Sequence, residues 1–492
     1  MSNNISAKKT KGRVYTPDYI IKNILDMSHY ISGNILEKHV IDNSCGDGAF
    51  LCEIVNRYCN SALSKGISPD NLQKHLEKYI HGIEIDPIEH AKCLENVNNV
   101  AKKFGINNDV SWDIICADTL TVNKFNRKMD FVLGNPPYVR VHNLEDTFDI
   151  YKNFSFAQGG MIDLYIIFYE IGIKMLNKNG VLGYITPSSF FNSLAGKYMR
   201  KYFVDENLIE KLVDLKHFQA FTATTYTTIV ILNNHHDSKE IEYYQFDEKN
   251  LIPYYVETLT SDDYYISNNF YFSTKKNLNL LKKVFFNLGE CQVEVKNGYA
   301  TLCDDVFIGE FKFKSDYIIP VIKASRGEQK QIIYPYDKFG KLISKNKLEK
   351  DKQLYGYLLE NKGKLLNRSL ENKAENHWYA FGRSQAINDT YKDKISINSL
   401  LRTTDDLKII FAPEGTGVYS GLYLIGSKKE LEQIPVLLKS EEFLSYISLL
   451  GKYKSGGYYT FSSKDVKSYI NYKLAYNGGL LEWWITKIFW KL

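Results

Sequence analysis

Four consecutive residues, Asn135, Pro136, Pro137 and Tyr138, place an amide, a stiff backbone and an aromatic ring directly after an apolar run. That run, residues 130–134, reads Asp-Phe-Val-Leu-Gly and is typical of a buried strand. The exocyclic amino nitrogen of a base is a weak nucleophile, because its lone pair is delocalised into the ring. Two acceptors on its N–H groups would free that lone pair and stabilise the positive charge that develops during attack. The pattern predicts alkylation of a planar nitrogen.

Each of the four residues has an expected part in that chemistry. The side-chain oxygen of Asn135 is one acceptor, and the carbonyl of Pro136 is the other, held by the restricted proline backbone. The ring of Tyr138 offers a face on which an extruded base can stack. A simple Pro-Pro strand terminator is the alternative, and the chemistry of the neighbouring loops argues against it.

Three further apolar runs lie at residues 39–44, 79–85 and 112–118. Each has an acidic residue at or near its end, namely Asp42, Glu84 and Asp118. Ligands of open α/β sheets bind beyond the carboxyl ends of the strands. Glu84 there could accept both hydroxyls of a ribose, and Asp118 could accept from an adenine amino group. Capping of a following helix, by Asp86 or by Asp118 itself, is an equally open reading of these acids.

Gly46 and Gly48 follow the first of these runs, where glycine lets the backbone approach a ligand closely. The third glycine of a dinucleotide fingerprint is missing, and so is the Lys-Ser/Thr pair of a P-loop. The three loops therefore describe a pocket for an adenosine-containing ligand without a pyrophosphate. S-adenosylmethionine fits that description.

The elements that must position these groups follow from alternating patterns in the first 240 residues. Apolar residues at i, i+3, i+4 and i+7, such as Leu51, Ile54, Val55 and Tyr58, predict amphipathic helices. Helices are expected over 45–59, 87–105 and 161–180, and further strands over 181–187, 210–215 and 226–232. The fold class is therefore α/β, Rossmann-like, with a mostly parallel sheet and an antiparallel edge.

Charge and composition bound the rest of the 492-residue chain. Residues 1–290 hold 31 Lys and Arg against 34 Asp and Glu, whereas residues 291–492 hold 31 against 23. A basic C-terminal part is expected if it faces phosphates, although a solvated basic surface explains it equally well. Seven Cys without zinc spacing predict reduced thiols and no metal. No signal peptide or membrane span is expected, and the aromatic segment 479–492 predicts a helix packed on the body.

The ordered series of motifs resembles the gamma-group, TaqI-like DNA adenine-N6 methyltransferases of type II restriction-modification systems. Residues 12–17, GRVYTP, resemble the N-terminal cofactor motif, and 42–51, DNSCGDGAFL, resemble the cofactor loop DPxxGxGxFL. Asn43 stands where that loop usually has proline. Residues 217–232 resemble the late motif whose aromatic residue closes the other face of the flipped base. Phe221 is the expected aromatic, with Tyr226 and Phe218 as alternatives.

The resemblance implies a set of functional residues. The catalytic residues would be Asn135, Pro136, Pro137, Tyr138 and Phe221. The cofactor S-adenosyl-L-methionine would be bound by Tyr15, Thr16, Pro17, Asp42, Cys45, Gly46, Gly48, Phe50, Glu84, Ile85, Asp118, Thr119 and Asn135. DNA would be contacted by Arg140, Lys323, Arg326 and Arg383, and no metal is needed.

The resemblance also implies a domain plan and partners. Residues 1–245 would form the catalytic methyltransferase domain, 246–290 a connection, and 291–492 a mixed α+β target-recognition domain. The enzyme would methylate adenine N6 in double-stranded DNA. It would act as a monomer in a prokaryotic cytoplasm. Because the first cofactor motif starts at residue 12, a fused restriction-methylation enzyme is not expected, and the sequence leaves open whether a separate cognate restriction endonuclease exists.

Two other functions remain open at this point. One is methylation of another planar nitrogen, such as a glutamine amide of a protein or a base of RNA. The other is a catalytically silent DNA-binding protein on the same scaffold. The basic C-terminal region favours DNA over the first, and the complete motifs from Thr16 to Tyr138 favour catalysis over the second.

Overall fold

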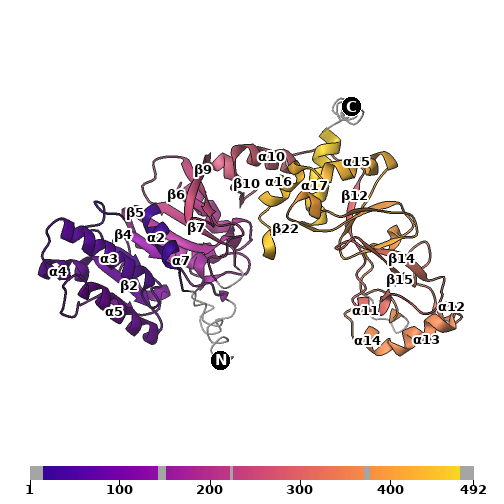
Figure 1. Cartoon of the computed structure of the whole chain (residues 1–492), viewed down its shortest axis with the longest axis horizontal. Helices are drawn as coiled ribbons and strands as arrows, with labels where there is room; N and C mark the ends of the chain where they lie inside the picture. Colours follow the sequence, from indigo (N-terminus) through magenta and orange to yellow (C-terminus); the bar gives the residue numbers. More distant parts are fainter. Residues whose placement is uncertain (1–14, 142–150, 222–224, 371–376, 477–492) are drawn as a thin grey trace. The chain divides into compact units, whose positions relative to one another are not determined.

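The computed structural model describes residues 15–141, 151–221, 225–370 and 377–476 (Figure 1). The chain divides into two compact units, Met1–Asn279 and Leu280–Leu492. The boundary falls within helix α10 (Lys275–Phe285). The first unit holds the motifs identified in the sequence, and its architecture determines how they meet.

A nine-stranded sheet forms the centre of the first unit. Its strands are β1 (Val40–Asp42), β2 (Ile80–Glu84), β3 (Asp113–Cys116), β4 (Met129–Gly134), β5 (Leu176–Pro187), β6 (Ile209–Asp214), β7 (Thr227–Asn233), β8 (Glu240–Asp247) and β9 (Ile252–Thr260). They lie in the order β3-β2-β1-β4-β5-β7-β6-β8-β9. The first five are parallel to one another, whereas β7 runs antiparallel to both β5 and β6, and β9 runs antiparallel to β8. The mostly parallel sheet with an antiparallel edge is confirmed.

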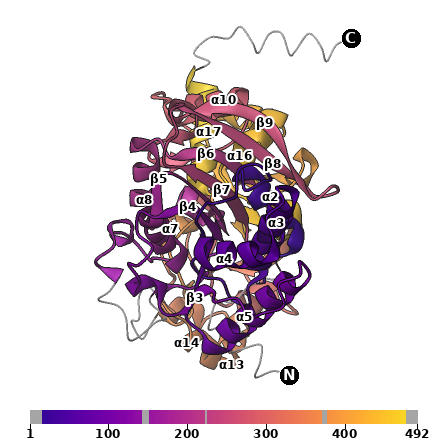
Figure 2. The same ribbon diagram turned by 90° about the vertical axis from the view of Figure 1, so that its left-hand side faces the viewer.

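Helices cover both faces of this sheet. They are α2 (Asp18–Met27), α3 (Ala49–Ser64), α4 (Pro69–Tyr79), α5 (Pro87–Lys102), α7 (Leu164–Met175) and α8 (Lys197–Asp205). The buried faces of α2, α3, α4 and α5 share one core cluster with alternate residues of the parallel strands, such as Val40 and Phe131. Figure 2 shows α7 and α8 on the other side of the sheet. The predicted stripe of Leu51, Ile54 and Val55 is the buried side of α3.

Two elements differ from the sequence prediction. The helix expected over 161–180 begins at Leu164 and ends at Met175, and Leu176 already belongs to β5. The side chain of Asn177 accepts from the N–H of Asn179, which turns the chain, and a Cβ at Gly180 would lie 2.7 Å from the carbonyl oxygen of Met129. Helix α4 was not expected, although its Leu72, Leu76 and Tyr79 recur at helical spacing.

The sheet also extends further along the chain than the alternating pattern. Strands β8 and β9 pair as an antiparallel hairpin up to Thr260, so the connection expected over 246–290 begins inside a strand of the sheet. The alternation of strands and helices in the sequence ends before the sheet does, because two strands of a hairpin are joined without a crossover helix. Short elements follow: α9 (Ser261–Tyr264), β10 (Tyr265–Ile266) and β11 (Asn269–Phe270).

In its described residues, the second unit is built from three small sheets and short helices. The sheets have the orders β12-β20-β16-β18, β13-β15-β14-β19 and β17-β22-β21. Their strands are β12 (Glu294–Asn297), β13 (Ile308–Gly309), β14 (Ile318–Lys323), β15 (Glu328–Ile333), β16 (Lys394–Ile397), β17 (Leu400–Leu401), β18 (Ile409–Ala412), β19 (Gly417–Tyr419), β20 (Leu422–Ile425), β21 (Tyr453–Lys454) and β22 (Tyr458–Thr460). The helices are α11 (Asp304–Phe307), α12 (Lys345–Leu348), α13 (Lys352–Glu360), α14 (Lys362–Leu366), α15 (Lys428–Leu438), α16 (Glu441–Leu449) and α17 (Ser463–Tyr476). This is the expected mixed α+β character, and its role in target recognition stays a prediction.

None of the helices in the described parts of the chain has the length and apolar character needed to cross a bilayer. The aromatic segment 479–492, predicted to be a helix, lies outside the described residues.

Candidate functional site

The loops that follow β1, β2, β3 and β4 surround a cavity of about 530 Å³ at the carboxyl edge of the sheet. Its lining includes these residues expected from the sequence: Tyr15, Thr16, Asp42, Cys45, Gly46, Phe50, Glu84, Ile85, Asp118, Thr119, Asn135 and Pro137. The lining does not include Pro17, Gly48, Pro136, Tyr138 or Phe221. Lining residues that the sequence reasoning missed are Asn43, Ser44, Asp47, Ala49, Ile83, Asp86, Pro87, Glu89, Leu120, Val139, Tyr151, Leu164 and Phe168.

The turn from β1 into α3 needs its two glycines. Gly46 and Gly48 have φ angles of 56° and 90°, in the left-handed region that favours glycine. A Cβ at Gly48 would lie 2.8 Å from the Sγ of Cys93 on α5. The turn therefore lies against α5, and the backbone of Gly46 borders the cavity.

Glu84 connects two of the loops. Its Oε2 accepts a 2.8 Å hydrogen bond from the N–H of Gly46, and its Oε1 accepts one of 2.8 Å from the N–H of Asp86. Asp86 in turn caps α5, because its Oδ1 accepts from the N–H groups of Ile88 and Glu89. Asp86 therefore both caps α5 and lines the cavity, whereas Glu84 joins the loops after β1 and β2, a distinction that the sequence alone left open.

Asp118 does both things that the sequence allowed. Its Oδ1 accepts from the N–H of Leu120 and caps the short 3₁₀ helix η1 (Thr119–Thr121), while the residue also lines the cavity. The Oγ1 of Thr119 donates to the carbonyl oxygen of Asn43 at 2.6 Å. The loops after β1 and β3 are therefore joined directly.

Asp42, the last residue of β1, is a buried acid in the cavity wall. Its Oδ1 accepts from the N–H of Ser44, and a Cβ on Gly134, the last residue of β4, would lie 2.6 Å from the same oxygen. Burial raises the pKa of Asp42 to about 7, and the nearby Glu84 carboxylate adds to the rise. Between about pH 4 and about pH 7 the folded chain therefore holds a proton here that the unfolded chain has lost.

Replacing Asp42 with asparagine is expected to change how stability depends on pH. In the unmodified chain, Asp42 lowers the free energy of unfolding as pH rises from about 4 to about 7, by at most about 1.4 kcal/mol per pH unit. Asparagine cannot ionise, and it keeps an oxygen that can accept from Ser44. Urea unfolding measures the free energy of unfolding at about pH 5 and about pH 8. The decrease between these two pH values should be smaller for Asp42→Asn than for the unmodified chain. An equal loss in both proteins would contradict the assigned pKa.

Asn135 has one satisfied and one unsatisfied side-chain atom. Its Nδ2 donates a 3.0 Å hydrogen bond to the Oγ1 of Thr16, which orients the amide. Its Oδ1 is buried and has no hydrogen-bond partner among the described residues. A buried acceptor without a partner typically costs about 1–3 kcal/mol, and an N–H donor on a ligand would remove that penalty. The oxygen with the predicted acceptor role is thus the one that the protein leaves available.

Tyr138 lies beside two further rings. Its hydroxyl donates to the carbonyl oxygen of Ile185 at 3.1 Å, and burial raises its pKa well above the ordinary value. Its ring centroid lies 6.1 Å from that of Phe221 and 6.3 Å from that of Tyr165, with the planes at 78° and 77°. Phe218 instead stacks on Phe246, with the ring centroids 4.9 Å apart. Of the candidates for closing a base pocket, Phe221 is the one whose ring contacts Tyr138 among the described residues, and its role stays a prediction.

The residues expected to contact DNA are exposed or partly exposed. Arg140 follows Tyr138 closely, and its Nε lies 4.0 Å from an oxygen of Asp163, a weak pairing. Lys323 ends β14, Arg326 lies in the turn before β15, and Arg383 is exposed in a loop. Their contacts with DNA remain predictions.

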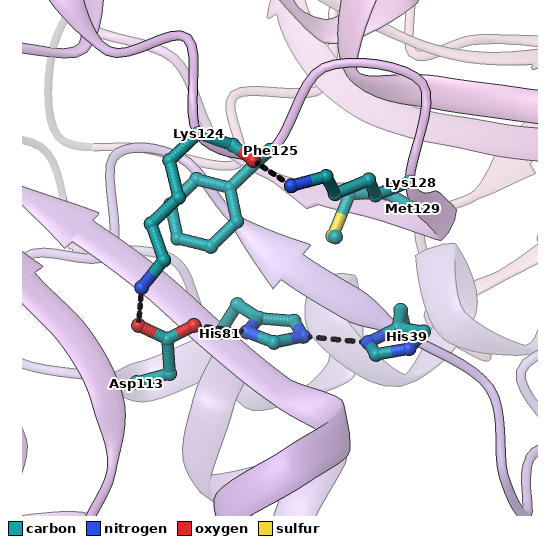
Figure 3. A pocket seen from close by; sticks show the side chains of 7 residues that line it. All are labelled: His39, His81, Asp113, Lys124, Phe125, Lys128 and Met129. Atoms are coloured by element: carbon teal, nitrogen blue, oxygen red, sulfur yellow. Dashed lines mark hydrogen bonds and ion pairs between the residues drawn. The ribbon is translucent and has the colours of Figure 1, made fainter.

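Figure 3 shows a second pocket, of about 300 Å³, lined by His39, His81, Asp113, Lys124, Phe125, Lys128 and Met129. Several of these residues precede or begin parallel strands, so the pocket lies at the edge of the sheet opposite the cavity. Lys124 pairs with Asp113, which bonds His81, which bonds His39. Burial lowers the pKa of His81 to about 4, so the ring is neutral near pH 7. The side chains of Lys124, Asp113, His81 and His39 thus serve as hydrogen-bond and ion-pair partners for one another. Their network links the starts of neighbouring strands.

Comparison with known proteins agrees with the geometry of the carboxyl-edge cavity. Residues 24–221 match the family model of the Eco57I restriction-modification methylase. The first unit contains a restriction-modification methylase domain. This confirms the family resemblance that the motifs indicated, at the level of the domain.

Relatives of the methylase domain extend over different shares of the chain. The type II methyltransferase M.BstVI of Geobacillus stearothermophilus is 30% identical over 277 residues, or 54% of this chain and 48% of that protein. The type II restriction enzyme and methyltransferase RM.Eco57I of Escherichia coli is 24% identical over 551 aligned residues, or 89% of this chain and 54% of that protein. The chain thus spans about half the length of these curated relatives.

A solved structure shares the fold across most of the chain. The type IIL restriction-modification enzyme MmeI, determined in complex with DNA, superposes with a TM-score of 0.56. It is 14% identical and covers 91% of this chain and 63% of its own. At this identity the likeness concerns the fold, which includes elements beyond the methylase domain.

Proposed function

We propose that this chain transfers a methyl group from S-adenosylmethionine to N6 of an adenine swung out of double-stranded DNA. The observation that carries the proposal is the buried, unpartnered Oδ1 of Asn135, on a loop whose next aromatic residue, Tyr138, contacts Phe221. An amino group presented there would find the acceptor that the described residues leave without a donor. We also propose that the enzyme modifies DNA as part of a restriction-modification system.

The cavity lining fits a cationic adenosine ligand. Among the described residues, six acidic ones line it, Asp42, Asp47, Glu84, Asp86, Glu89 and Asp118, and no Lys or Arg does. S-adenosylmethionine carries a net positive charge, and acidic surroundings favour such a ligand over a nucleotide phosphate. Exposed apolar surface on Tyr15 and Ile85 could cover an adenine ring. When bound, the cofactor supplies an electrophilic methyl group on a sulfonium sulfur.

The chain's own residues would activate the acceptor nitrogen. The Oδ1 of Asn135 accepts from one N–H of the adenine amino group, and the Pro136 carbonyl accepts from the other. These contacts localise the lone pair on N6 and stabilise its growing positive charge. Tyr138 and Phe221 hold the base between their rings, after the edge contact now joining them has opened. The extra proton leaves N6 for solvent after transfer.

The named relatives support DNA as the substrate, since they are a type II methyltransferase and a combined restriction enzyme and methyltransferase. They do not favour methylation of a protein amide or of RNA, or a catalytically silent protein. We further propose that the second unit selects the target sequence and that the enzyme acts as a monomer in a prokaryotic cytoplasm.

Sequencing methylated adenines in the DNA of cells that express the chain is the direct test. We expect N6-methyladenine at nearly every copy of one short sequence, and none above background in cells that express Asn135→Ala at the same level. Unmethylated DNA from cells with folded, cofactor-binding protein would refute the proposal. Methylcytosine in place of methyladenine would refute the choice of N6.

A further inference from the structure

Two large apolar side chains protrude from neighbouring loops next to the methylase motifs. Met161 is 68% exposed and Leu194 is 66% exposed. The loops touch, because a Cβ on Gly160 would lie 3.3 Å from the Cβ of Leu194 and 3.0 Å from the backbone nitrogen of Ala195. The exposed side chains thus come from loops in backbone contact, although they are far apart in sequence.

The loop of Met161 is joined to the chain that leaves Tyr138. The N–H of Val141 donates to the carbonyl oxygen of Ile162 at 3.0 Å, and the N–H of Leu164 donates to that of Val139 at 2.8 Å. Met161 therefore lies beside the backbone that continues from the predicted base-holding residue.

The loop of Leu194 is anchored by a buried arginine. Arg200 is 2% exposed, and its Nη1 donates to the carbonyl oxygens of Phe190 at 2.6 Å and Ser193 at 2.8 Å. Its Nε donates to the carbonyl oxygen of Asn268 at 2.8 Å. A buried guanidinium with three such bonds fixes the backbone on both sides, because breaking them would leave a charge buried without partners. Leu194 is thus presented by a rigid loop.

The same loop reaches the predicted base pocket through aromatic contacts. The ring of Tyr165 lies 6.3 Å from that of Tyr138 and 6.5 Å from that of Phe190. The hydroxyl of Tyr165 also bonds the Oγ of Ser189 at 3.1 Å. A rigid path therefore connects the loop of Leu194 to the ring expected to hold the flipped base.

Exposed cations accompany the apolar pair. The guanidinium of Arg140 lies two residues past Tyr138, and the ammonium of Lys197 lies 5.6 Å from the ring centre of Tyr198. A Cβ on Gly159 would lie 3.3 Å from that same ring, so Lys197 stands next to the loop of Met161. In DNA, the stacked bases are apolar and the phosphates on either side are negatively charged. The exposed apolar side chains are therefore suited to contact bases, and the neighbouring cations to contact phosphates.

We propose that Leu194, supported by Met161, is a wedge that enters the DNA stack at the position vacated by the target adenine. The proposal rests on the proposed function, because it concerns how the adenine reaches Asn135. Apolar side chains inserted between bases offset part of the unstacking that flipping requires. A rigid mount makes insertion effective, since no loop has to be ordered at the moment of binding.

The test compares two duplexes that contain the sequence identified by methylated-base mapping. In one, the target adenine is paired with thymine; in the other, it lies opposite an abasic position and needs no unpairing. We expect Leu194→Ala to lower the methylation rate about 10- to 100-fold on the paired duplex and to leave the rate on the abasic duplex close to that of the unmodified chain. Leu194→Met should restore most of the loss. Leu63→Ala, on the exposed side of α3, is the matched control and should affect neither rate.

A second measurement follows flipping itself. With 2-aminopurine in place of the target adenine, the unmodified chain should increase fluorescence, and Leu194→Ala should reduce that increase while cofactor affinity stays unchanged. Equal rates for Leu194→Ala and the unmodified chain on both duplexes would overturn the wedge, as would an equal loss on both. Failure of the proposed function is distinguishable, because the unmodified chain would then methylate neither duplex.

Discussion

Replacing Asn135 with alanine is expected to lower the rate of methyl transfer by roughly 10²–10³-fold, the loss typical when one preorganised stabilising group is removed. Asn135 is the residue whose Oδ1 is buried without a partner among the described residues, while its Nδ2 is held by Thr16. Alanine removes the acceptor without adding charge or bulk. Single-turnover transfer of labelled methyl groups to DNA measures the rate, and titration with S-adenosylmethionine measures cofactor affinity.

A matched control for this change is Asn60→Ala, which removes an exposed amide from α3. It should leave both transfer and cofactor affinity unaltered. Near-normal turnover by Asn135→Ala would reject the acceptor role. A parallel fall in cofactor affinity would instead assign Asn135 to cofactor binding.

Glu84→Gln is expected to weaken cofactor binding by roughly 10- to 100-fold, because hydrogen bonds to a charged group are worth about 1.5–3 kcal/mol. The two oxygens of Glu84 accept from the backbones of Gly46 and Asp86. Glutamine has one oxygen, so its NH₂ group would face one of those N–H donors. The change also removes a negative charge from the wall of the cavity. Calorimetric titration with S-adenosylmethionine measures the effect.

Glu95→Gln is the control for the loss of one negative charge, since Glu95 is exposed on α5. It should bind the cofactor as the unmodified chain does. Unchanged affinity in Glu84→Gln would mean that the cofactor does not rely on this acid or on the loops it joins.

The sequence predicted which loops would meet, because the ends of parallel strands share one edge of a sheet. The acids at residues 42, 84 and 118 therefore line one cavity. It could not tell which of Glu84 and Asp86 caps the following helix, since both are acids and they lie two residues apart. Their hydrogen bonds separate them, because Glu84 accepts from Gly46 in another loop, whereas Asp86 accepts locally from Ile88 and caps α5.

Contacts between residues far apart in the chain could not be predicted from the sequence either. The hydrogen bond between Asn135 and Thr16 spans 119 positions, and nothing local signals it. Leu194 looked like any apolar residue, because burial is a property of the fold and not of the side chain. The hairpin of β8 and β9 extended the sheet without the helix by which the alternating pattern was recognised. The residue roles and domain limits inferred from motifs stay predictions.

Asn43 and Tyr184 are coupled by a buried hydrogen bond, so a change at one position depends on the other. In the related loop this position usually holds proline, whereas here the Oδ1 of Asn43 accepts from the hydroxyl of Tyr184 at 2.9 Å in a buried setting. A change to proline alone would leave that hydroxyl without its acceptor in the interior. Loss of the Tyr184 hydroxyl alone would likewise leave the Oδ1 of Asn43 without its donor, so either single change is expected to destabilise the protein. A proline-bearing loop grafted from a relative would therefore need a matching change at position 184, so that no buried hydroxyl is left without an acceptor.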